Sequence, residues 1–405
     1  MIYFLITPIL VMIANLFNIY NYIVFYIPNI LMIILSIKYL YNNRYKMLDK
    51  KEYIILFIFI ACSIISCSFS LNPLYSIFGN SYRVEGLFTY LSYIGFFICG
   101  TRLIKDDNNK KIINIFILVA LILSILTLAH LDICYKLFNI DKVHDYYDYR
   151  AIFPQFNHFA YYLLSANICC IFMFIYSNKY KIIYFIINTV LLYTLISNDT
   201  LGVIIAYIVG LILLIIYSLI KYKKIKEIIC IIISFILIGI SAKDYNRENI
   251  FIKNYKQIIQ DTNQVIDSSS EEQLYSVGTD RGKLWIYAIK YIKQRPLLGY
   301  GFDNTIILYT RDNIDQSKPH NHILDLCLNS GVISMICYVI LVLSIVIKNL
   351  KNIKKLELKY ILSLIIVISF ILNLMVGNST FYVSPYFYIF LGVLGQNYYK
   401  KVCLE

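Results

Sequence analysis

The residues of this chain that could carry out chemistry gather between Thr279 and Gly331, a polar stretch in an otherwise apolar sequence. Arg281 opens a predicted helix there, and His320 stands beside Asn321 at the start of a long apolar run. A histidine near its ordinary pKa suits general-base work on a hydroxyl, and guanidinium groups match anionic phosphate ligands. These residue types predict group transfer from a phosphate-activated donor.

A Pro-x-x-Gly-x-Gly turn, Pro296 to Gly301, lies between the arginine and the histidine. Gly299 and Gly301 permit backbone conformations or close approaches that larger residues forbid. The turn lacks the GK[ST] of a P-loop, and it lacks the strand and the third glycine of a dinucleotide fingerprint. It therefore indicates neither kind of nucleotide site.

A metal site is not indicated by this stretch. In a helix, His320 and His322 would point about 200° apart, which disfavours a site built on both imidazoles. Asp303 and Asp325 stand isolated in the sequence, and there is no HExxH motif and no CxxC pair. We expect no catalytic metal and no cofactor.

Long apolar runs surround the polar stretch and must position it. Hydrophobic residues make up 59% of the chain and charged residues 15%, and the runs are long enough to cross a hydrocarbon layer of about 30 Å. The pattern predicts an all-α, polytopic membrane protein with about twelve transmembrane helices. The expected spans are 2–18, 22–41, 53–70, 87–104, 112–132, 156–177, 182–197, 201–220, 227–243, 321–347, 360–377 and 384–399.

The basic residues orient these spans. Clusters such as Lys221–Lys226 and Lys348–Lys359 each follow an even-numbered span, and the positive-inside rule places such loops and both termini in the cytoplasm. The formal net charge of +13 therefore gives topology and does not indicate nucleic-acid binding. The expected organisation is a bundle of nine spans in 1–243, a large extracytoplasmic loop in 244–320, and three spans with a cytoplasmic tail in 321–405.

Within the outward loop, 261–278 is polar and is expected to be flexible or partly ordered, whereas 281–294 is predicted to be an amphipathic helix. Thr279 and Asp280 suit its N-cap, and Pro296 follows its end. Two interpretations stay open for this helix. It is an interfacial anchor on the membrane surface, or Arg281 binds phosphate at the end where the helix dipole favours anions.

The order of these motifs resembles the signature of the O-antigen ligase and polysaccharide polymerase superfamily of bacterial membrane glycosyltransferases. The shared order is an outward Arg, a Trp, Pro-x-x-Gly-x-Gly, His-Asn-x-x-Leu and a downstream Gly. The likeness extends to FGNSYRVEGLFTYL (78–91), to YRAIFPQFNHFAYYL (149–163) and to the region of Asn378. One departure is the SNDT of 197–200, where the family often has Ser-Arg-Gly, so an auxiliary arginine is missing.

The resemblance implies an inverting, metal-independent transfer of a glycan from a polyprenyl (undecaprenyl) diphosphate to an acceptor hydroxyl or amine. The reaction would take place on the outer face of the cytoplasmic membrane, with a glycan or lipid-linked acceptor and membrane lipids as partners and no nucleic acid. His320 would be the base, and Arg281 and Arg150 would hold the diphosphate. The residues expected to contact substrate are Arg83, Asn321, Asn157, Gly299 and Gly301.

Several alternatives remain open at this point. A polysaccharide polymerase of the same superfamily or a protein O-oligosaccharyltransferase would use the same residues. A secondary transporter would need polar groups deep within its spans, and a peptidoglycan polymerase an outward catalytic carboxylate. Arg83 and Arg150 could instead anchor the chain near lipid phosphates. Glu85 and Asp303 are the carboxylates considered for sugar contacts.

Overall fold

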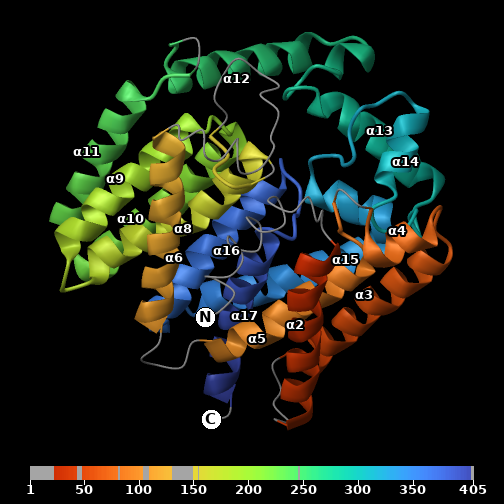
Figure 1. Ribbon diagram of the computed structural model, residues 1–405, viewed down its shortest axis with the longest axis horizontal. Coiled ribbons are helices and arrows are strands. Elements are labelled where there is room, and N and C mark those ends of the chain that lie inside the picture. Colours follow the sequence, from red (N-terminus) through yellow and green to blue (C-terminus); the bar gives the residue numbers. More distant parts are fainter. Residues whose placement is uncertain are drawn as a thin grey trace. The chain divides into compact units, whose positions relative to one another are not determined.

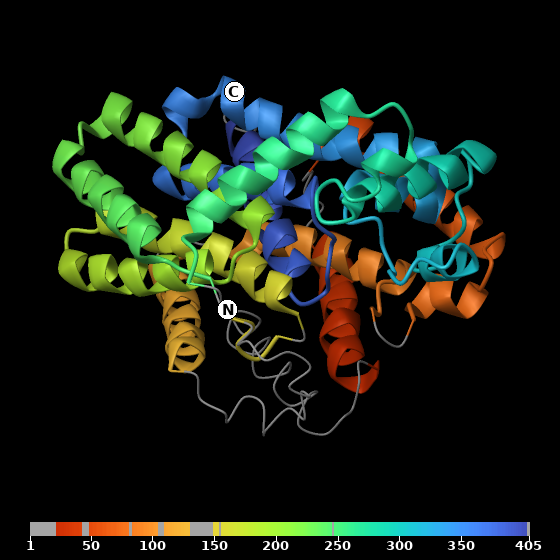
Figure 2. The ribbon, with the colours of Figure 1, turned by 90° about the horizontal axis from the view of Figure 1, so that it is seen from above.

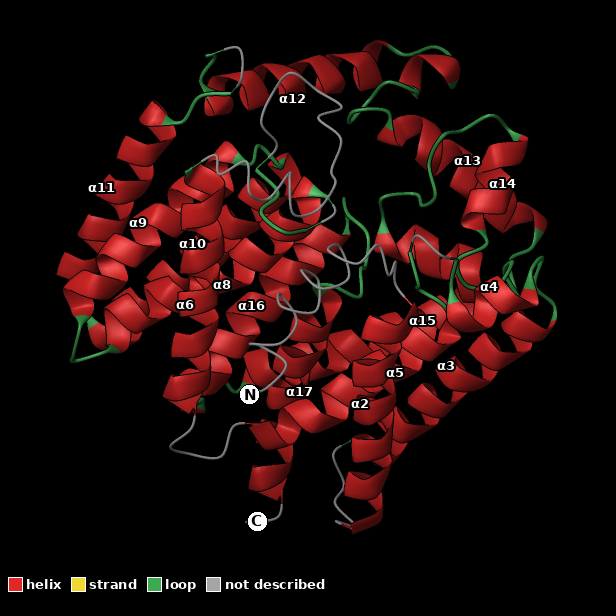
Figure 3. Cartoon of the chain, viewed as in Figure 1, coloured by secondary structure: helices red, strands yellow, loops and turns green. Residues whose placement is uncertain are grey.

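The computed structural model describes residues 22–42, 48–80, 83–103, 109–129, 149–153, 155–244 and 247–402 (Figures 1 and 2). Helices and loops account for these residues, with no strand among them (Figure 3). The predicted all-α class is confirmed. The first predicted span, 2–18, lies outside the described residues.

Each of the other predicted spans coincides with a helix whose ends differ from the prediction by a few residues. The helices are α2 (Tyr22–Asn42), α3 (Lys50–Ser68), α5 (Leu87–Leu103), α6 (Asn109–Leu128), α8 (Phe156–Tyr176), α9 (Lys181–Ser197), α10 (Leu201–Tyr222), α11 (Ile225–Ser241), α15 (His322–Lys351), α16 (Leu358–Leu374) and α17 (Ser384–Val402). Among the described residues, α3, α6, α8, α10 and α15 are long and apolar enough to cross a membrane, and four shorter helices are apolar as well. The chain is a multi-pass membrane protein, while the total of about twelve spans stays a prediction.

The remaining helices lie between the apolar ones. They are α4 (Pro73–Phe78), α12 (Ile250–Asp267), α13 (Arg281–Gln294), α14 (Thr305–Arg311) and the 3₁₀ turns η1 (Glu272–Leu274) and η2 (Ile353–Lys355). The start and end of α13 are those predicted. The segment 261–278 is partly helical, because α12 continues into it. Beyond the helix, the Gln273 side chain accepts the backbone N–H of Ser269 at 2.6 Å, which orders this part of the segment.

The chain folds into two compact units that each combine separate parts of the sequence. The described residues of the first unit lie within Leu103–Gln257 and Ile361–Asn373, and those of the second lie within Tyr20–Arg102, Ile258–Tyr360 and Leu374–Glu405. This division follows packing and differs from the expected division by membrane side into 1–243, 244–320 and 321–405, which stays a prediction. One of the points at which the chain passes from one unit to the other falls within α12.

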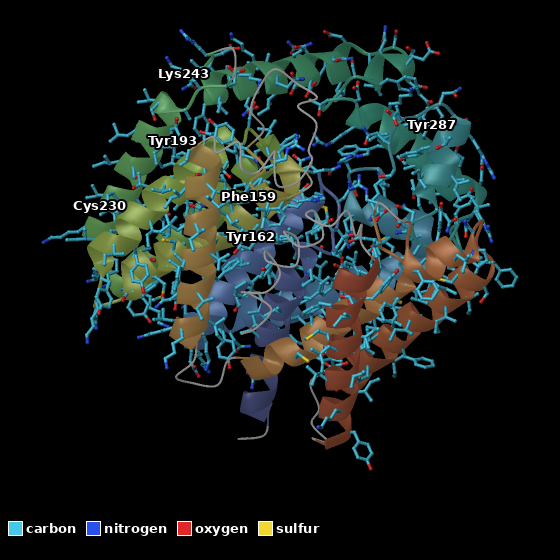
Figure 4. All side chains as sticks on the ribbon, viewed as in Figure 1. Phe159, Tyr162, Tyr193, Cys230, Lys243 and Tyr287 are labelled. Carbon is cyan, nitrogen blue, oxygen red and sulfur yellow. The ribbon has the colours of Figure 1, made fainter. Side chains whose placement is uncertain are left out.

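Helix α8 is the buried centre of the first unit. It packs against α6, α9, α10 and α11, and its residues from His158 to Ile175 are buried. Phe159 and Tyr162 point into this interior, whereas Cys230 of α11 is exposed (Figure 4). A helix that is apolar on every side is stable only when neighbours or lipid surround it, and here helices of the same unit do so.

Helix α15 organises the second unit. It packs along α3 and also contacts α13, α14 and α17, and α13, α14 and α4 lie together near one end of α3 in Figures 1 and 2. Its helical course is broken at Gly331, where φ is 83° and ψ is 166°. The part of α15 before this break carries the residues that follow His320.

Candidate functional site

The turn Pro296–Gly301 packs directly against the break in α15. The backbone N–H of Tyr300 donates to the carbonyl of Leu328 at 2.6 Å, and the N–H of Val332 donates back to the first residue of the turn at 2.8 Å. Backbone groups of α15 that have no partner within the broken helix therefore form hydrogen bonds with the turn. This exchange fixes the start of α15 to the segment that follows α13.

Glycine is required on both sides of this contact. A Cβ on Gly331 would lie 2.0 Å from the carbonyl oxygen of Leu297, and a Cβ on Gly299 would lie 2.6 Å from that of Leu328. Gly299 and Gly301 have φ of 65° and 91°, in the left-handed region that favours glycine. Their predicted role in close backbone approach is confirmed, and their contact with substrate stays a prediction.

Helix α13 presents Arg281 at its first turn. Asp280 occupies the predicted N-cap position, but its backbone is left-handed, with φ 66°, and its side chain makes no capping hydrogen bond. The amides of Gly282 and Lys283 donate instead to carbonyls of the preceding turn, at 3.0 and 3.2 Å. Because these amides are occupied, the Arg281 side chain is the group that could hold an anion here.

The apolar face of α13 packs on protein. Leu284, Ala288 and Tyr291 are buried in one cluster with residues of α14, α15 and the glycine turn. The hydroxyl of Tyr309 donates to the carbonyl of Leu284 at 2.7 Å, which ties α14 to α13. This face therefore needs no lipid to cover it, and the position of α13 relative to a membrane surface stays a prediction.

The histidine loop, defined here as Ser317–Asn321, is held from both of its sides. Arg83 Nε donates to Ser317 Oγ at 2.8 Å. On the other side, the indole N–H of Trp285 donates to the carbonyl of Pro319 at 2.9 Å. The loop thus joins the Arg83 segment to α13, two regions that are far apart in the sequence.

His320, the fourth residue of this loop, is half-buried and has a left-handed backbone with φ 51°. Its Nδ1 is 3.2 Å from the amide nitrogen of Asn378, and its Nε2 is 3.4 Å from Gln316 Oε1. The next residue, Asn321, caps α15 by accepting two backbone N–H groups, and its amide donates to the carbonyl of Met375 at 2.9 Å. Asn321 therefore orients the loop through contacts within the protein.

Three cations lie near enough to the imidazole for their charges to act on it. Burial lowers the pKa of His320 to about 3, and the charges of Arg281, Arg83 and Lys318 contribute to the decrease. Arg281 Nη1 donates to the carbonyl of Gly278 at 3.0 Å. Its Nε is buried and has no hydrogen-bond partner in the part of the chain that the structure describes. The second unit thus contains both a neutral imidazole and an arginine donor for which the described residues supply no acceptor.

A buried ionic cluster lies behind the histidine loop. Lys318 Nζ is 2.5 Å from Glu85 Oε2 and 3.3 Å from Asp325 Oδ2, and each of the three residues is 1% exposed. Glu85 also accepts hydrogen bonds from the hydroxyls of Tyr93 and Ser379, at 2.6 and 2.7 Å. Burial opposes ionisation of Glu85, but the Lys318 charge and the hydrogen bonds to this carboxylate together outweigh burial and lower its pKa. Burial lowers and the carboxylates raise the pKa of Lys318, with a net increase.

Sequence reasoning missed this cluster. It treated Asp303 and Asp325 as isolated, and the folded chain brings both close to Lys318. Asp303 Oδ2 accepts the backbone N–H of Asn80 at 2.8 Å, and burial raises the pKa of Asp303 to about 6. Glu85 and Asp303 point into the protein, so the structure gives no support to sugar contacts by these carboxylates. The only feature of the sequence near His320 that pointed to the cluster was Lys318, two residues before it.

Arg150 and Asn157 belong to the first unit. The amide of Asn198 donates to the carbonyls of Tyr149 and Phe156, at 2.6 and 3.0 Å, and thus holds both ends of the segment with Arg150. Thr200 Oγ1 donates to Asn157 Oδ1 at 3.2 Å. Asn198, in the 197–200 segment where the sequence departs from the resembled motif, therefore supports the Arg150 segment. Any meeting of Arg150 with His320 stays a prediction.

The structure also describes the other histidine near the site. His322 begins α15, is 1% exposed and packs its ring against Tyr338 at a centroid distance of 5.3 Å. No three His, Cys, Asp or Glu residues within the described ranges are grouped as metal ligands. His322 is therefore part of the core of the second unit and not of the half-buried face that carries His320.

Comparison with known proteins identifies related sequences. Residues 185–339 match the family model described as O-antigen ligase, a range that includes α13, the glycine turn and the histidine loop. Proteins of Rickettsia prowazekii (strain Madrid E) and Rickettsia typhi (strain Wilmington), both named as candidate polysaccharide ligases, are 28% identical to this chain over 204 residues. The alignment covers 47% of this chain and 46% of each relative, so about half of each protein is compared.

Proposed function

Because the family-model match confirms the resemblance to the O-antigen ligase superfamily, we propose that this membrane protein is a glycosyltransferase of the ligase type. It moves a glycan from a polyprenyl (undecaprenyl) diphosphate to an acceptor hydroxyl or amine, with inversion and without a metal. The observation that carries the proposal is that the loop of His320 is held by Arg83 on one side and by α13, the helix that begins with Arg281, on the other.

His320 is the proposed base. A neutral imidazole has one acceptor nitrogen, and the low pKa of His320 keeps the ring neutral at physiological pH. In the proposed reaction, the ring nitrogen that carries no proton takes the proton of the acceptor hydroxyl. That proton leaves as the acceptor oxygen bonds to the sugar carbon and the bond from this carbon to the diphosphate breaks.

Arg281 and Arg150 are the proposed diphosphate-binding residues, assisted by Arg83. Cleavage of the sugar–phosphate bond places charge on the departing diphosphate, and guanidinium groups in a water-poor site stabilise that charge in the transition state. The buried Nε of Arg281, to which the described residues offer no acceptor, supports this role. Asn321, Asn157, Gly299 and Gly301 are proposed to complete the substrate site, alongside the structural roles described above.

The membrane supplies the remaining partners. The lipid tail of the donor lies among the apolar helices, and the acceptor, a glycan or a lipid-linked oligosaccharide, comes from the extracytoplasmic side. This orientation in the cytoplasmic membrane is supported by the basic clusters in the alternate loops. A polysaccharide polymerase would use the same base and the same arginines, with a growing chain as acceptor.

The test is turnover by purified protein in nanodiscs that contain a polyprenyl-diphosphate glycan and an acceptor. We expect His320→Ala to lower the rate by about 10²- to 10⁴-fold, the usual contribution of a general base. Arg281→Ala and Arg150→Ala should each raise the barrier by about 3 kcal/mol, as lost oxyanion donors do. Lys290→Ala, which removes an exposed charge from α13, is the matched control and should leave the rate unchanged.

Each variant must elute as a monodisperse species with a thermal midpoint near that of the unaltered protein before its rate is interpreted. Donor consumption at the normal rate by His320→Ala would overturn the assignment of the base. An unaltered protein that consumes no donor, with several lipid-linked glycans offered, would overturn the proposed function itself.

A further inference from the structure

Lys318, Glu85 and Asp325 form an ion cluster that stability alone does not explain. All three are 1% exposed, and removing charges from water costs about as much as a buried ion pair returns. Apolar residues of similar size would fill the same space at no greater cost. What the charges supply in addition is a defined geometry, and the segments they join are those that carry the proposed site.

We infer that Lys318, held by Glu85 and Asp325, is a positioning residue for the transfer reaction: it fixes the loop of His320 to the segment of Arg83. This inference rests on the proposed function. Lys318 is buried, so its ammonium does not reach a substrate and acts through its neighbours. Lys318 therefore sets the relative positions of His320 and Arg83.

The sequence neighbours of the cluster support this role. Lys318 is two residues before His320, and Glu85 is two residues after Arg83. The 2.5 Å contact between Lys318 and Glu85 joins two segments that lie 233 residues apart in the chain. A displacement of this contact would move the base relative to the guanidinium, and displacements of about 1 Å can cost about 10²-fold in rate.

A third segment is joined at the same point. Ser379 donates to Glu85 Oε2 at 2.7 Å, and its neighbour Asn378 lies 3.2 Å from His320 Nδ1. One carboxylate thus connects the lysine beside the base with the segment that contacts the base ring. The backbone of His320 is left-handed, with φ 51°, a conformation that persists in a non-glycine residue only when its surroundings hold it.

Asp325 completes the arrangement from α15. It lies in the first turn of this helix and is 3.3 Å from Lys318 Nζ. Because α15 also carries the Gly331 break, the lysine links the histidine loop to the part of the helix that the glycine turn fixes. The cluster therefore belongs to the same framework that determines the direction of α15.

The experiment compares Lys318→Met, Glu85→Gln and the double variant with both changes, in the nanodisc turnover assay. The double variant removes the base-side charge together with its closest partner, so it leaves fewer buried charges unpaired than Lys318→Met does. Lys348→Met is the matched control, because Lys348 lies near the other end of α15 and pairs with Glu52 at 2.5 Å and Asp49 at 2.8 Å. We expect at least a tenfold loss of kcat in the folded double variant and none in the control.

Two readouts separate positioning from a loss of folded protein. Donor KM should change much less than kcat, because the arginines remain. Removing Lys318 also removes one of the charges that lower the pKa of His320, so the acid limb of the pH–rate profile should move to higher pH. A lower content of folded protein would reduce the height of this profile without moving it. Carbethoxylation of His320, followed by mass spectrometry at several pH values, reports the same shift without turnover.

The outcomes are distinct. If the double variant is folded and matches the unaltered protein in kcat and in the pH of the acid limb, while His320→Ala is inactive, the inference fails and the proposed function stands. If the unaltered protein consumes no donor, the proposed function fails. Recovery of kcat in Lys318→Arg, with the acid limb back at its original pH, would add support.

Discussion

His320 shows how residue-level electrostatics could serve the proposed reaction. Burial and three nearby cations keep the imidazole neutral, with a pKa of about 3 before any anionic ligand is present. A diphosphate bound by the arginines would offset those cations and raise the pKa of the ring toward the range of an effective base. In this arrangement the donor itself would prepare the base that activates the acceptor.

Asp303 gives a residue-level prediction about stability. Burial raises its pKa from 3.8 to about 6 in the folded protein. Because the folded chain binds this proton more tightly than the unfolded chain, the contribution of Asp303 to stability is full below about pH 4 and is lost as pH rises to about 6. At pH 7 the loss should be about 2 to 3 kcal/mol, from about two pKa units.

The measurement is the thermal midpoint of the detergent-solubilised protein between pH 4.5 and 7, compared with that of Asp303→Asn. The difference between the two proteins should shrink or reverse in favour of the variant as pH rises. The exposed Asp315→Asn is the control and should follow the unaltered protein. Parallel curves for Asp303→Asn and the unaltered protein would contradict the assigned ionisation.

At the level of elements, the glycine turn joins the end of α13 to α15 through backbone contacts. The turn after α13 supplies donors and an acceptor to the broken helix, and the glycines bring two backbones closer than any Cβ permits. The histidine loop lies between these two helices in the sequence. Its position therefore depends on contacts that the loop itself does not make.

Gly331→Ala tests this contact between the glycine turn and α15. The added Cβ would lie 2.0 Å from a backbone oxygen, at a φ of 83° that alanine rarely adopts. We expect a destabilisation of at least about 2 kcal/mol, the usual range for such backbone strain, seen as a lower thermal midpoint and a lower yield of monodisperse protein. Ile333→Ala, at an exposed position of the same helix, should have little effect. Equal stability of the two variants would contradict the close backbone contact at Gly331.

The sequence predicted those elements whose pattern is local. The apolar spans and α13 have the length, periodicity and end signals that define helices. The cluster of Lys318, Glu85 and Asp325 could not be predicted, because its members are separated by up to 240 residues and no short-range spacing connects them. For the same reason, Trp285 gave no sign that its indole holds the carbonyl before the histidine.

At the scale of the whole molecule, the proposal draws on both compact units. Arg150 comes from the first unit, and His320, Arg281 and Arg83 come from the second. The proposed mechanism therefore requires both units to act on one donor. Loss of turnover in Arg150→Ala, measured as described above, is the direct test of this requirement.

The whole-molecule prediction concerns metals, since cations that hold the diphosphate come from side chains in the proposed mechanism. We expect the turnover rate to change less than twofold when the nanodisc assay contains excess EDTA, and again when Mg²⁺ or Mn²⁺ is added back. Loss of turnover in EDTA, with recovery on addition of one of these ions, would show that a metal takes part and would contradict the side-chain mechanism.

Trp285 is the single tryptophan of the chain, and its indole N–H is bonded to the residue before His320. Ultraviolet-excited emission at long wavelength from the unlabelled protein therefore arises beside the histidine loop and nowhere else. Any ligand that moves this loop would change the colour or intensity of that emission. The chain thus carries an intrinsic fluorophore, with which occupancy of the site could be titrated before a glycan substrate is known.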